Sequence, residues 1–212
     1  MKTGKLTIFT SYSPGAGKTY LMVSRAMEEK RRGKTVCFGF LNGSHRDMQK
    51  LLDENGFKEQ RRRKYSSHKL IAERPKMIVM DEMGMHGINT DNEKTFVYQD
   101  IEQILAEGID VYATANLKRF HCVNPLFKQV TGIGIKKTIP SRFLDMADKI
   151  YFIDRKPELL MQDFESGNLF NDKYMNSKIM KKNFEADTLT AYREISLKFL
   201  KKYEKKVEVV IR

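Results

Sequence analysis

The stretch KLTIFTSYSPGAGKTYLMVSRAMEEK, residues 5–30, sets the fold of this 212-residue chain. Residues 5–10 are rich in apolar and β-branched side chains, which predicts a strand, and residues 19–30 have helical character and end shortly before Gly33. Between the two lies SPGAGKT, residues 13–19. A strand, a glycine-rich turn and a helix in this order are typical of a phosphate-binding loop.

Such a loop holds a nucleotide phosphate mainly through its backbone. A turn made by Gly15 and Gly17 leaves N–H groups pointing inward, and the helix that begins at Lys18 aims its positive end at the same point. Lys18 would bridge the terminal phosphates, and Thr19 would be a ligand of Mg²⁺. The expected nucleotide-binding residues are Ser13, Pro14, Gly15, Ala16, Gly17, Lys18 and Thr19.

The loop departs from the usual pattern at one position. GxxxxGK[ST] begins with glycine, whereas this chain has Tyr12 there. The alternative to a nucleotide site is a glycine turn that joins strand to helix without a ligand. The strand before the motif and the helix after it favour the nucleotide site.

Two acidic residues follow the apolar run MIVM, residues 77–80. Asp81 is placed to hold Mg²⁺ through water, and Glu82, the expected catalytic residue, could orient or deprotonate an attacking water. Acidic residues also end strands merely because the chain leaves the core, but behind a phosphate-binding loop the metal site is favoured. Asn116 ends a further expected strand and could contact the γ-phosphate or cap a turn; the sequence leaves both open.

Strands and helices alternate along the first 155 residues. Helices are expected after the turn at 42–44, carrying Met48, Leu51 and Leu52, and at about 93–107. This alternation predicts an α/β fold of the phosphate-loop NTPase type, with a mainly parallel sheet covered by helices on both faces. The expected strands after the first are 35–41, 76–80, 109–116, 133–139 and 149–154.

The last part of the chain has a different character. We expect a nucleotide-binding core at 1–155 and a mainly helical extension at 156–212 that packs on it. In the extension an amphipathic stripe recurs at intervals of three or four residues. Its members are Leu189, Tyr192, Ile195, Phe199 and Tyr203.

Composition limits the possible classes of protein. With 41% hydrophobic residues the chain can bury a core, which excludes a wholly disordered protein. No apolar run approaches the roughly 20 residues of a membrane-spanning helix or forms a signal peptide, so a cytoplasmic protein without a membrane span is expected. The two cysteines, Cys37 and Cys122, argue against a disulfide framework, and the four histidines show no metal-binding spacing.

The net charge of +12 could indicate a nucleic-acid partner. However, the basic residues are divided between 61–64 and the lysine-rich C-terminal end. An exposed loop at 61–64 and solvated helix faces at the C-terminal end explain them better than a nucleic-acid site does. We therefore do not expect a nucleic-acid partner.

Several strings together resemble one family, the N-terminal cytoplasmic domain of the KdpD sensor kinases for potassium limitation and osmotic stress. The similarity covers about residues 4–200. It implies a phosphate-loop fold, ATP and Mg²⁺ as cofactors, and a regulatory role with a signalling protein as partner. The strings are PGAGKTYLM (14–22), RPKMIVMDE (74–82), YQDIEQILAEGIDVYATAN (98–116), VTGIGIKKTIP (130–140), the D-x-A-D of 145–148 and TAYREISLK (190–198).

The chain also departs from that family. Where the family usually has Glu-Thr-His-Gly-Arg, residues 42–46 read NGSHR, and the loop after Glu82 is not rich in His, Pro and Arg. Both changes border the expected nucleotide site and weaken the case for hydrolysis more than for binding. The resemblance implies either a free-standing relative or a detached first domain. A slow ATPase or phosphotransferase is the alternative function, and Arg46, Arg119 and Arg142 are the conceivable donors to a developing γ-phosphate charge.

Overall fold

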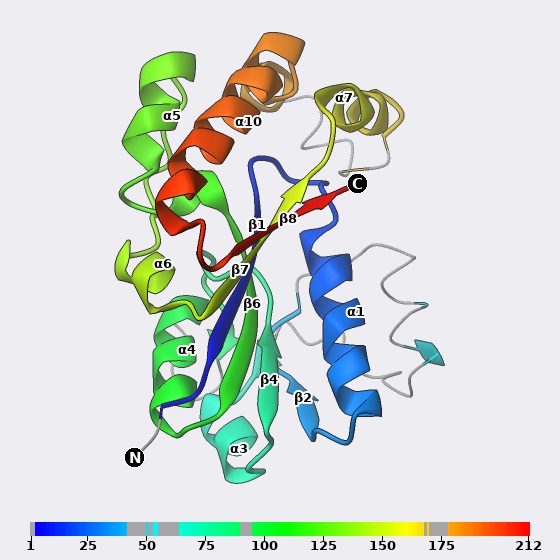
Figure 1. Ribbon diagram of the computed structural model, residues 1–212, viewed down its shortest axis with the longest axis vertical. Helices are drawn as coiled ribbons and strands as arrows, with labels where there is room; N and C mark the ends of the chain where they lie inside the picture. Colours follow the sequence, from blue (N-terminus) through cyan, green and yellow to red (C-terminus); the bar gives the residue numbers. More distant parts are fainter. Residues whose placement is uncertain are drawn as a thin grey trace.

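The computed structural model describes residues 3–41, 50, 53–54, 64–89, 95–167, 169 and 178–212. Its centre is a six-stranded sheet in the order β2-β4-β6-β1-β7-β8, in which every neighbouring pair is parallel (Figure 1). The expected α/β fold with a mainly parallel sheet is therefore confirmed. The strands are β1 (Leu6–Ser11), β2 (Val36–Phe38), β4 (Met77–Met80), β6 (Asp110–Asn116), β7 (Lys149–Asp154) and β8 (Val207–Ile211). A separate pair joins β3 (Lys64–Tyr65) to β5 (Ile88–Asn89).

Helices cover both faces of the sheet, as the alternation predicts. Successive side chains of a strand point to opposite faces, so Ile8 and Phe9 of β1 enter two different apolar clusters. Helix α1 (Lys18–Arg31) buries Met22 against the cluster of Phe9, and α4 (Val97–Ala106) buries Ile104 against that of Ile8. All six residues of β1 are buried, as expected for a central strand of a sheet covered on both sides.

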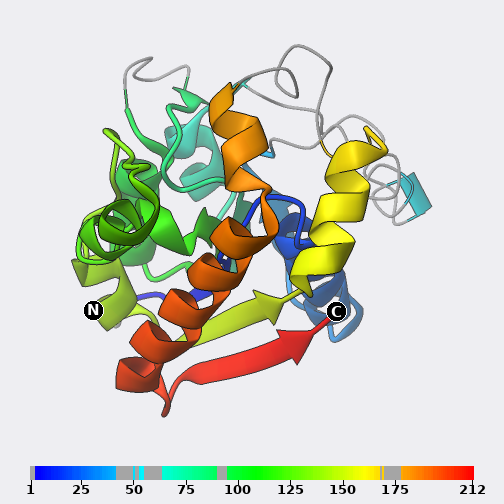
Figure 2. The same ribbon diagram turned by 90° about the horizontal axis from the view of Figure 1, so that it is seen from above.

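Further helices gather toward the end of the sheet at which the strands finish. Figure 1 shows α5, α7 and α10 there, far from the N-terminus, and Figure 2 shows α7 in yellow and α10 in orange from above. The loop between β1 and α1 lies at this same end. The remaining elements are α3 (Ser67–Ala72), η1 (Leu117–Arg119), α5 (Asn124–Thr131), α6 (Arg142–Met146), α7 (Pro157–Glu165), α9 (Lys178–Asn183), α10 (Ala186–Leu200) and η2 (Lys201–Tyr203).

The C-terminal part of the chain packs on the core and also completes the sheet. Tyr192 of α10 is buried, and its ring centroid lies 4.9 Å from that of Phe127 in α5. The described part of 156–212 is mostly helical, but it ends in β8, which pairs in parallel with β7. This strand is not among those expected from the sequence, although VEVVI, residues 207–211, is rich in the β-branched residues that favour strands. It lies at the sheet edge and leaves Val209 and Ile211 exposed.

The strand expected at 133–139 is wrong. Helix α5 ends at Thr131 with Gly132 as its C-cap, and within 133–139 only Ile139 makes an isolated bridge, with Phe120. The Asn124 side chain accepts a hydrogen bond from Ile135 N at 3.0 Å and donates one to Ile135 O at 2.7 Å. Because a side chain satisfies these backbone groups, Ile135 makes no strand pairing. The turn at 42–44 and the positions of Met48, Leu51 and Leu52 lie outside the described residues.

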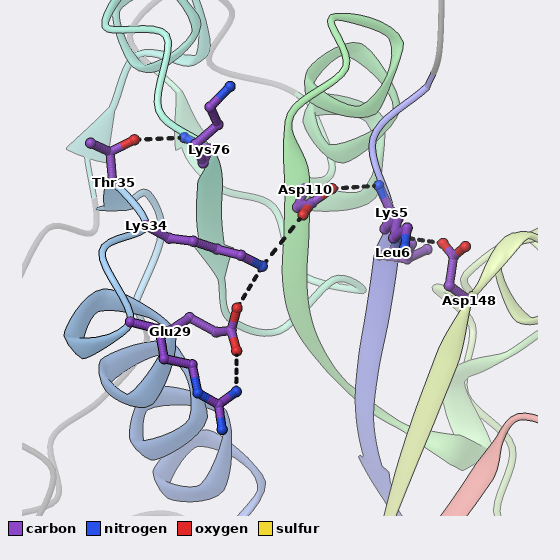
Figure 3. A network of polar contacts seen from close by, with 9 residues as sticks. Lys5, Leu6, Glu29, Lys34, Thr35, Lys76, Asp110 and Asp148 are labelled. Carbon is purple, nitrogen blue, oxygen red and sulfur yellow. Dashed lines mark hydrogen bonds and ion pairs between the residues drawn. The ribbon is translucent and has the colours of Figure 1, made fainter.

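Polar contacts fix the opposite end of the sheet, where the strands begin (Figure 3). Asp110 Oδ1 accepts a hydrogen bond from Lys5 N at 2.9 Å, and Asp148 Oδ2 accepts one from Leu6 N at 2.8 Å. Lys34 Nζ lies 2.5 Å from a carboxylate oxygen of Glu29 and 3.9 Å from one of Asp110. These contacts hold β1 in register with β6 and β7, and so position the loop that follows β1.

Candidate functional site

The loop between β1 and α1 has the backbone of a phosphate-binding turn. Gly15 and Gly17 have φ angles of 80° and 91°, which residues other than glycine rarely adopt. Gly17 is the N-cap of α1, and no side chain accepts a hydrogen bond at this cap. The first N–H groups of α1, together with the positive end of the helix, are therefore available to an anion.

Lys18 folds back over this loop. Its Nζ atom lies 3.2 Å from Ser11 Oγ and 3.3 Å from the carbonyl oxygen of Ser13, and the residue is only 6% exposed. Burial lowers the pKa of Lys18, although the charges of Glu82 and Asp81 oppose that shift. Among the residues that the structure describes, only neutral groups accept hydrogen bonds from this ammonium, which is an unfavourable environment for a buried charge unless an anion joins it.

The two expected metal-binding residues are in contact. Thr19 Oγ1 donates a hydrogen bond of 3.0 Å to Asp81 Oδ1, and the Thr114 hydroxyl donates to the same carboxylate oxygen. Asp81 is buried at the end of β4. One hydroxyl and one carboxylate suit Mg²⁺, which is usually held by one or two carboxylates together with substrate phosphates and water.

Glu82, the expected catalytic residue, has an unusual backbone. Its φ angle is 50°, a left-handed conformation that costs a residue other than glycine about 1–3 kcal/mol. Its N–H donates to Thr114 Oγ1 at 2.9 Å. Burial, and next the charge of Asp81, raise the pKa of the Glu82 carboxyl, while Lys18 and Arg119 oppose that rise. The sequence pattern gave no sign of the role of Thr114, whose single hydroxyl orients both acidic residues.

The structure explains why the loop tolerates Tyr12 in place of glycine. Tyr12 is completely buried, its ring packs 6.4 Å from that of Phe152, and its hydroxyl donates to the carbonyl oxygen of Arg155. Burial raises the pKa of this phenol, with the charge of Asp154 as the second cause. The side chain therefore anchors the loop to the core without occupying the turn.

Asn116 caps a turn, which was one of its two open alternatives. Its Oδ1 atom accepts a hydrogen bond from Lys118 N at 3.3 Å at the start of η1. Asn116 is also the register partner of Ser11, so it lies at the carboxyl edge beside the loop. Contact with a nucleotide stays a prediction.

The three arginines considered as partners of the γ-phosphate differ in their positions. The Arg119 side chain lies against Gly84, two residues after Glu82, where an added Cβ would be 2.9 Å from Arg119 Cδ, and its charge acts on both Lys18 and Glu82. Arg142 instead forms an ion pair of 2.7 Å with Glu102, and its side chain is 56% exposed. Arg46 lies outside the described residues.

Two further arginines reach the loop from the far end of the sequence. Arg155 Nη1 donates to the Gly15 carbonyl at 2.9 Å, and its Nη2 pairs with Asp163 of α7 at 2.5 Å. Arg212 Nη1 lies 2.5 Å from the point that a Cβ on Gly17 would occupy. No local sequence pattern indicates either contact. Arg155 could have been considered, however, because it directly follows the strand expected at 149–154 and so lies at the carboxyl edge of the sheet, where ligands bind.

The described residues contain no group of three or more His, Cys, Asp or Glu side chains that could hold a metal ion. None of their helices combines the length and the apolar character needed to cross a bilayer.

The chain is distantly similar to several solved structures. Thymidylate kinase from Ehrlichia chaffeensis aligns with a TM-score of 0.38 and 13% identity, covering 99% of this chain and 91% of that one.

Curated relatives are more similar in sequence. A putative sensor protein KdpD from Synechocystis is 30% identical over 93% of this chain and 55% of its own length. The sensor proteins KdpD of Clostridium acetobutylicum and Escherichia coli are 30% and 29% identical over 92% of this chain. The chain spans only 22% and 23% of those two proteins. The family model described as the osmosensitive K⁺ channel His kinase sensor domain matches residues 2–203, and the chain therefore belongs to the KdpD family.

Proposed function

We propose that this chain is an ATP-binding regulatory module of potassium and osmotic two-component signalling. In this proposal the bound nucleotide sets the state of the module, and a signalling protein is its partner. The signalling role is supported by membership of the KdpD family and by relatives named as sensor proteins.

The observation that carries nucleotide binding is the environment of Lys18. A buried ammonium with neutral acceptors lies beside an α-helix whose N-cap makes no side-chain hydrogen bond. A phosphate would supply the missing negative charge and accept hydrogen bonds from the first turn of α1. Ser13, Pro14, Gly15, Ala16 and Gly17 would form the backbone cradle around it.

Thr19 and Asp81 would hold Mg²⁺. The Thr19 hydroxyl donates a 3.0 Å hydrogen bond to the Asp81 carboxylate in the structure. Both oxygen atoms could instead turn toward a cation that also binds phosphate oxygens. When bound, the ion would neutralise phosphate charge.

A slow ATPase or phosphotransferase is the second candidate, and the position of Glu82 favours it. A carboxyl with a raised pKa, held by a strained backbone next to the expected metal site, is suited to orient or deprotonate water. Slow hydrolysis would be compatible with the regulatory role, because it would return the module to its ADP state.

The test is a titration of the purified chain with Mg-ATP and Mg-GTP, with thermal unfolding as the readout. A ligand at 100 times its Kd should stabilise the folded state by about 2.7 kcal/mol. Lys18→Ala should abolish or sharply weaken this stabilisation and leave the fold intact. Lys128→Ala, which changes an exposed lysine of α5, is the matched control and should bind as wild type does. Equal ATP affinity of the wild type and Lys18→Ala would contradict the nucleotide site.

A further inference from the structure

Two consecutive cations, Lys118 and Arg119, follow β6 in the short helix η1. The register of the sheet brings them to the phosphate-binding loop, because Asn116 pairs with Ser11 and Ser11 Oγ lies 3.2 Å from Lys18 Nζ. The Arg119 stem lies against Gly84, where an added Cβ would be 2.9 Å from Arg119 Cδ. Lys118 and Arg119 therefore border the space between the phosphate-binding loop and the acidic pair.

Lys118 has no anionic partner among the residues that the structure describes. Its Nζ atom donates to Asn183 Oδ1 of α9 at 3.1 Å and lies 4.7 Å from the ring centroid of Tyr192 in α10. The charges that act on it are those of Arg119 and Lys18, both of which are positive. Burial and this repulsion lower the pKa of Lys118 to about 8.

Arg119 likewise lacks a direct anionic partner among the described residues. Within the described part of the chain, its guanidinium makes no hydrogen bond and no ion pair. Its charge acts on Lys18, Lys118 and Glu82 from a distance. An arginine in such a position has all its donors available for a planar or tetrahedral anion.

Three cations thus face two carboxyl groups at one edge of the sheet. The three positive charges of Lys18, Lys118 and Arg119 exceed the two negative charges of Asp81 and Glu82. Lys18 is buried, and Lys118 and Arg119 are half-buried. Like charges held close together away from bulk water are stabilised when an anion neutralises them. The α- and β-phosphates would lie on the backbone cradle of the loop, so the group nearest η1 would be the last phosphoryl group.

We propose that Lys118 and Arg119 bind the terminal phosphoryl group of a nucleoside triphosphate and make the site selective for triphosphate over diphosphate. This inference rests on the proposed nucleotide binding. A diphosphate leaves both cations without an anion, whereas the γ-phosphate supplies the missing charge and hydrogen-bond acceptors. Because Lys118 also contacts Asn183 and Tyr192, the presence of that group changes the charge against which α9 and α10 pack.

Calorimetric titration with Mg-ADP and with the non-hydrolysable analogue Mg-AMPPNP tests this proposal. The wild type should bind Mg-AMPPNP more tightly. Lys118→Met and Arg119→Met should each weaken Mg-AMPPNP about tenfold or more, as expected for the loss of a charge-assisted hydrogen bond, and should leave Mg-ADP nearly unchanged. Arg142→Met is the matched control, since Arg142 pairs with Glu102 and should affect neither nucleotide.

A second variant and a stability measurement separate binding from packing. Asn183→Asp places a carboxylate beside Lys118 and should reduce the preference for Mg-AMPPNP while Mg-ADP still binds. Lys118→Met without nucleotide should unfold at the wild-type temperature or above, because it removes an uncompensated cation. Equal losses for both nucleotides, or an unchanged preference with a lower unfolding temperature, would overturn the proposal. Failure of the wild type to bind either nucleotide would overturn the proposed function as well.

Discussion

Thr19 and Asp81 lie 62 residues apart in the sequence, yet the Thr19 hydroxyl donates a 3.0 Å hydrogen bond to the Asp81 carboxylate. The contact joins the start of α1 to the end of β4, two strand positions away from β1 in the sheet. This hydrogen bond brings together a hydroxyl and a carboxylate oxygen, and Mg²⁺ prefers oxygen ligands.

Replacing Asp81 and Glu82 one at a time by the corresponding amides should separate the roles of the two carboxyls. Asp81→Asn should remove the Mg²⁺ dependence of nucleotide binding, because the amide has lost the charge that holds the cation. Glu82→Gln should retain binding and lose whatever hydrolysis the chain performs. Titrations with and without Mg²⁺, followed by phosphate release, measure both effects. Unchanged metal dependence in Asp81→Asn would rule out that residue as the metal ligand.

Thr114→Val should destabilise the protein. The Thr114 hydroxyl donates to Asp81 and accepts from Glu82 N, so valine leaves a buried N–H and a carboxylate oxygen without that partner. The expected loss in free energy of unfolding is about 1–3 kcal/mol, measured by urea denaturation.

Thr10→Val is the matched control for that experiment. Thr10 is equally buried in the neighbouring strand β1, and its Oγ1 atom has no hydrogen-bond partner in the part of the chain that the structure describes. Valine should therefore leave stability unchanged or raise it. A loss as large in Thr10→Val as in Thr114→Val would show that shape, and not hydrogen bonding, makes the difference.

The stability of the nucleotide-free protein should rise with pH through the titration of Lys118. Folding lowers its pKa from 10.5 to about 8, so between these values the unfolded chain binds the extra proton and the folded state gains stability as pH increases. The groups that face Lys118 are Arg119, Lys18, Asn183 and Tyr192.

Lys118→Met isolates this contribution. Subtracting its free energy of unfolding from that of the wild type at each pH should leave a rise of up to about 3 kcal/mol between pH 8 and 10.5. A difference that stays flat over this range would mean that the lysine keeps its ordinary pKa in the folded protein.

Hydrolysis by the isolated chain should be slow, well below the roughly 1–100 s⁻¹ of dedicated phosphoryl-transfer enzymes. A raised pKa keeps a larger fraction of Glu82 protonated than an ordinary carboxyl with a pKa of 4.5 would be, so the rate should increase with pH as the carboxylate forms. A steady-state phosphate-release assay across pH measures this, with Glu82→Gln as the inactive reference. Several turnovers per second without a partner would contradict the regulatory role.

Local patterns in the sequence predict most of the fold and the centre of the site. The loop at 13–19 and the acidic pair after β4 are short motifs whose context is itself local, and the parallel sheet follows from the alternation of elements. The strand expected at 133–139 was wrong because the Asn124 side chain takes the backbone bonds of Ile135, a contact that periodicity does not encode.

Contacts between distant segments explain the rest. Thr114 lies between Ala113 and Ala115, and no local pattern marks it as a site residue. Only the pairing of β6 with β4 and β1 places it under the acidic pair. Arg155 follows β7 by one residue, and the sequence does not reveal that its side chain turns back to Gly15. Strand β8 was not anticipated, although its residues, VEVVI at 207–211, are mostly β-branched and favour a strand; the expectation of a helical extension passed over this pattern.

The guanidinium of Arg155 connects the phosphate-binding loop to α7. It donates to the Gly15 carbonyl at 2.9 Å and to Asp163 at 2.5 Å, so any displacement of that carbonyl must either break one of the two bonds or move α7 as well. Binding or release of a phosphate at the loop would then shift α7, although α7 itself would not contact the phosphate. A partner protein bound to α7 would then respond to the position of this helix, and so to whether the loop is occupied, without any release of a reaction product.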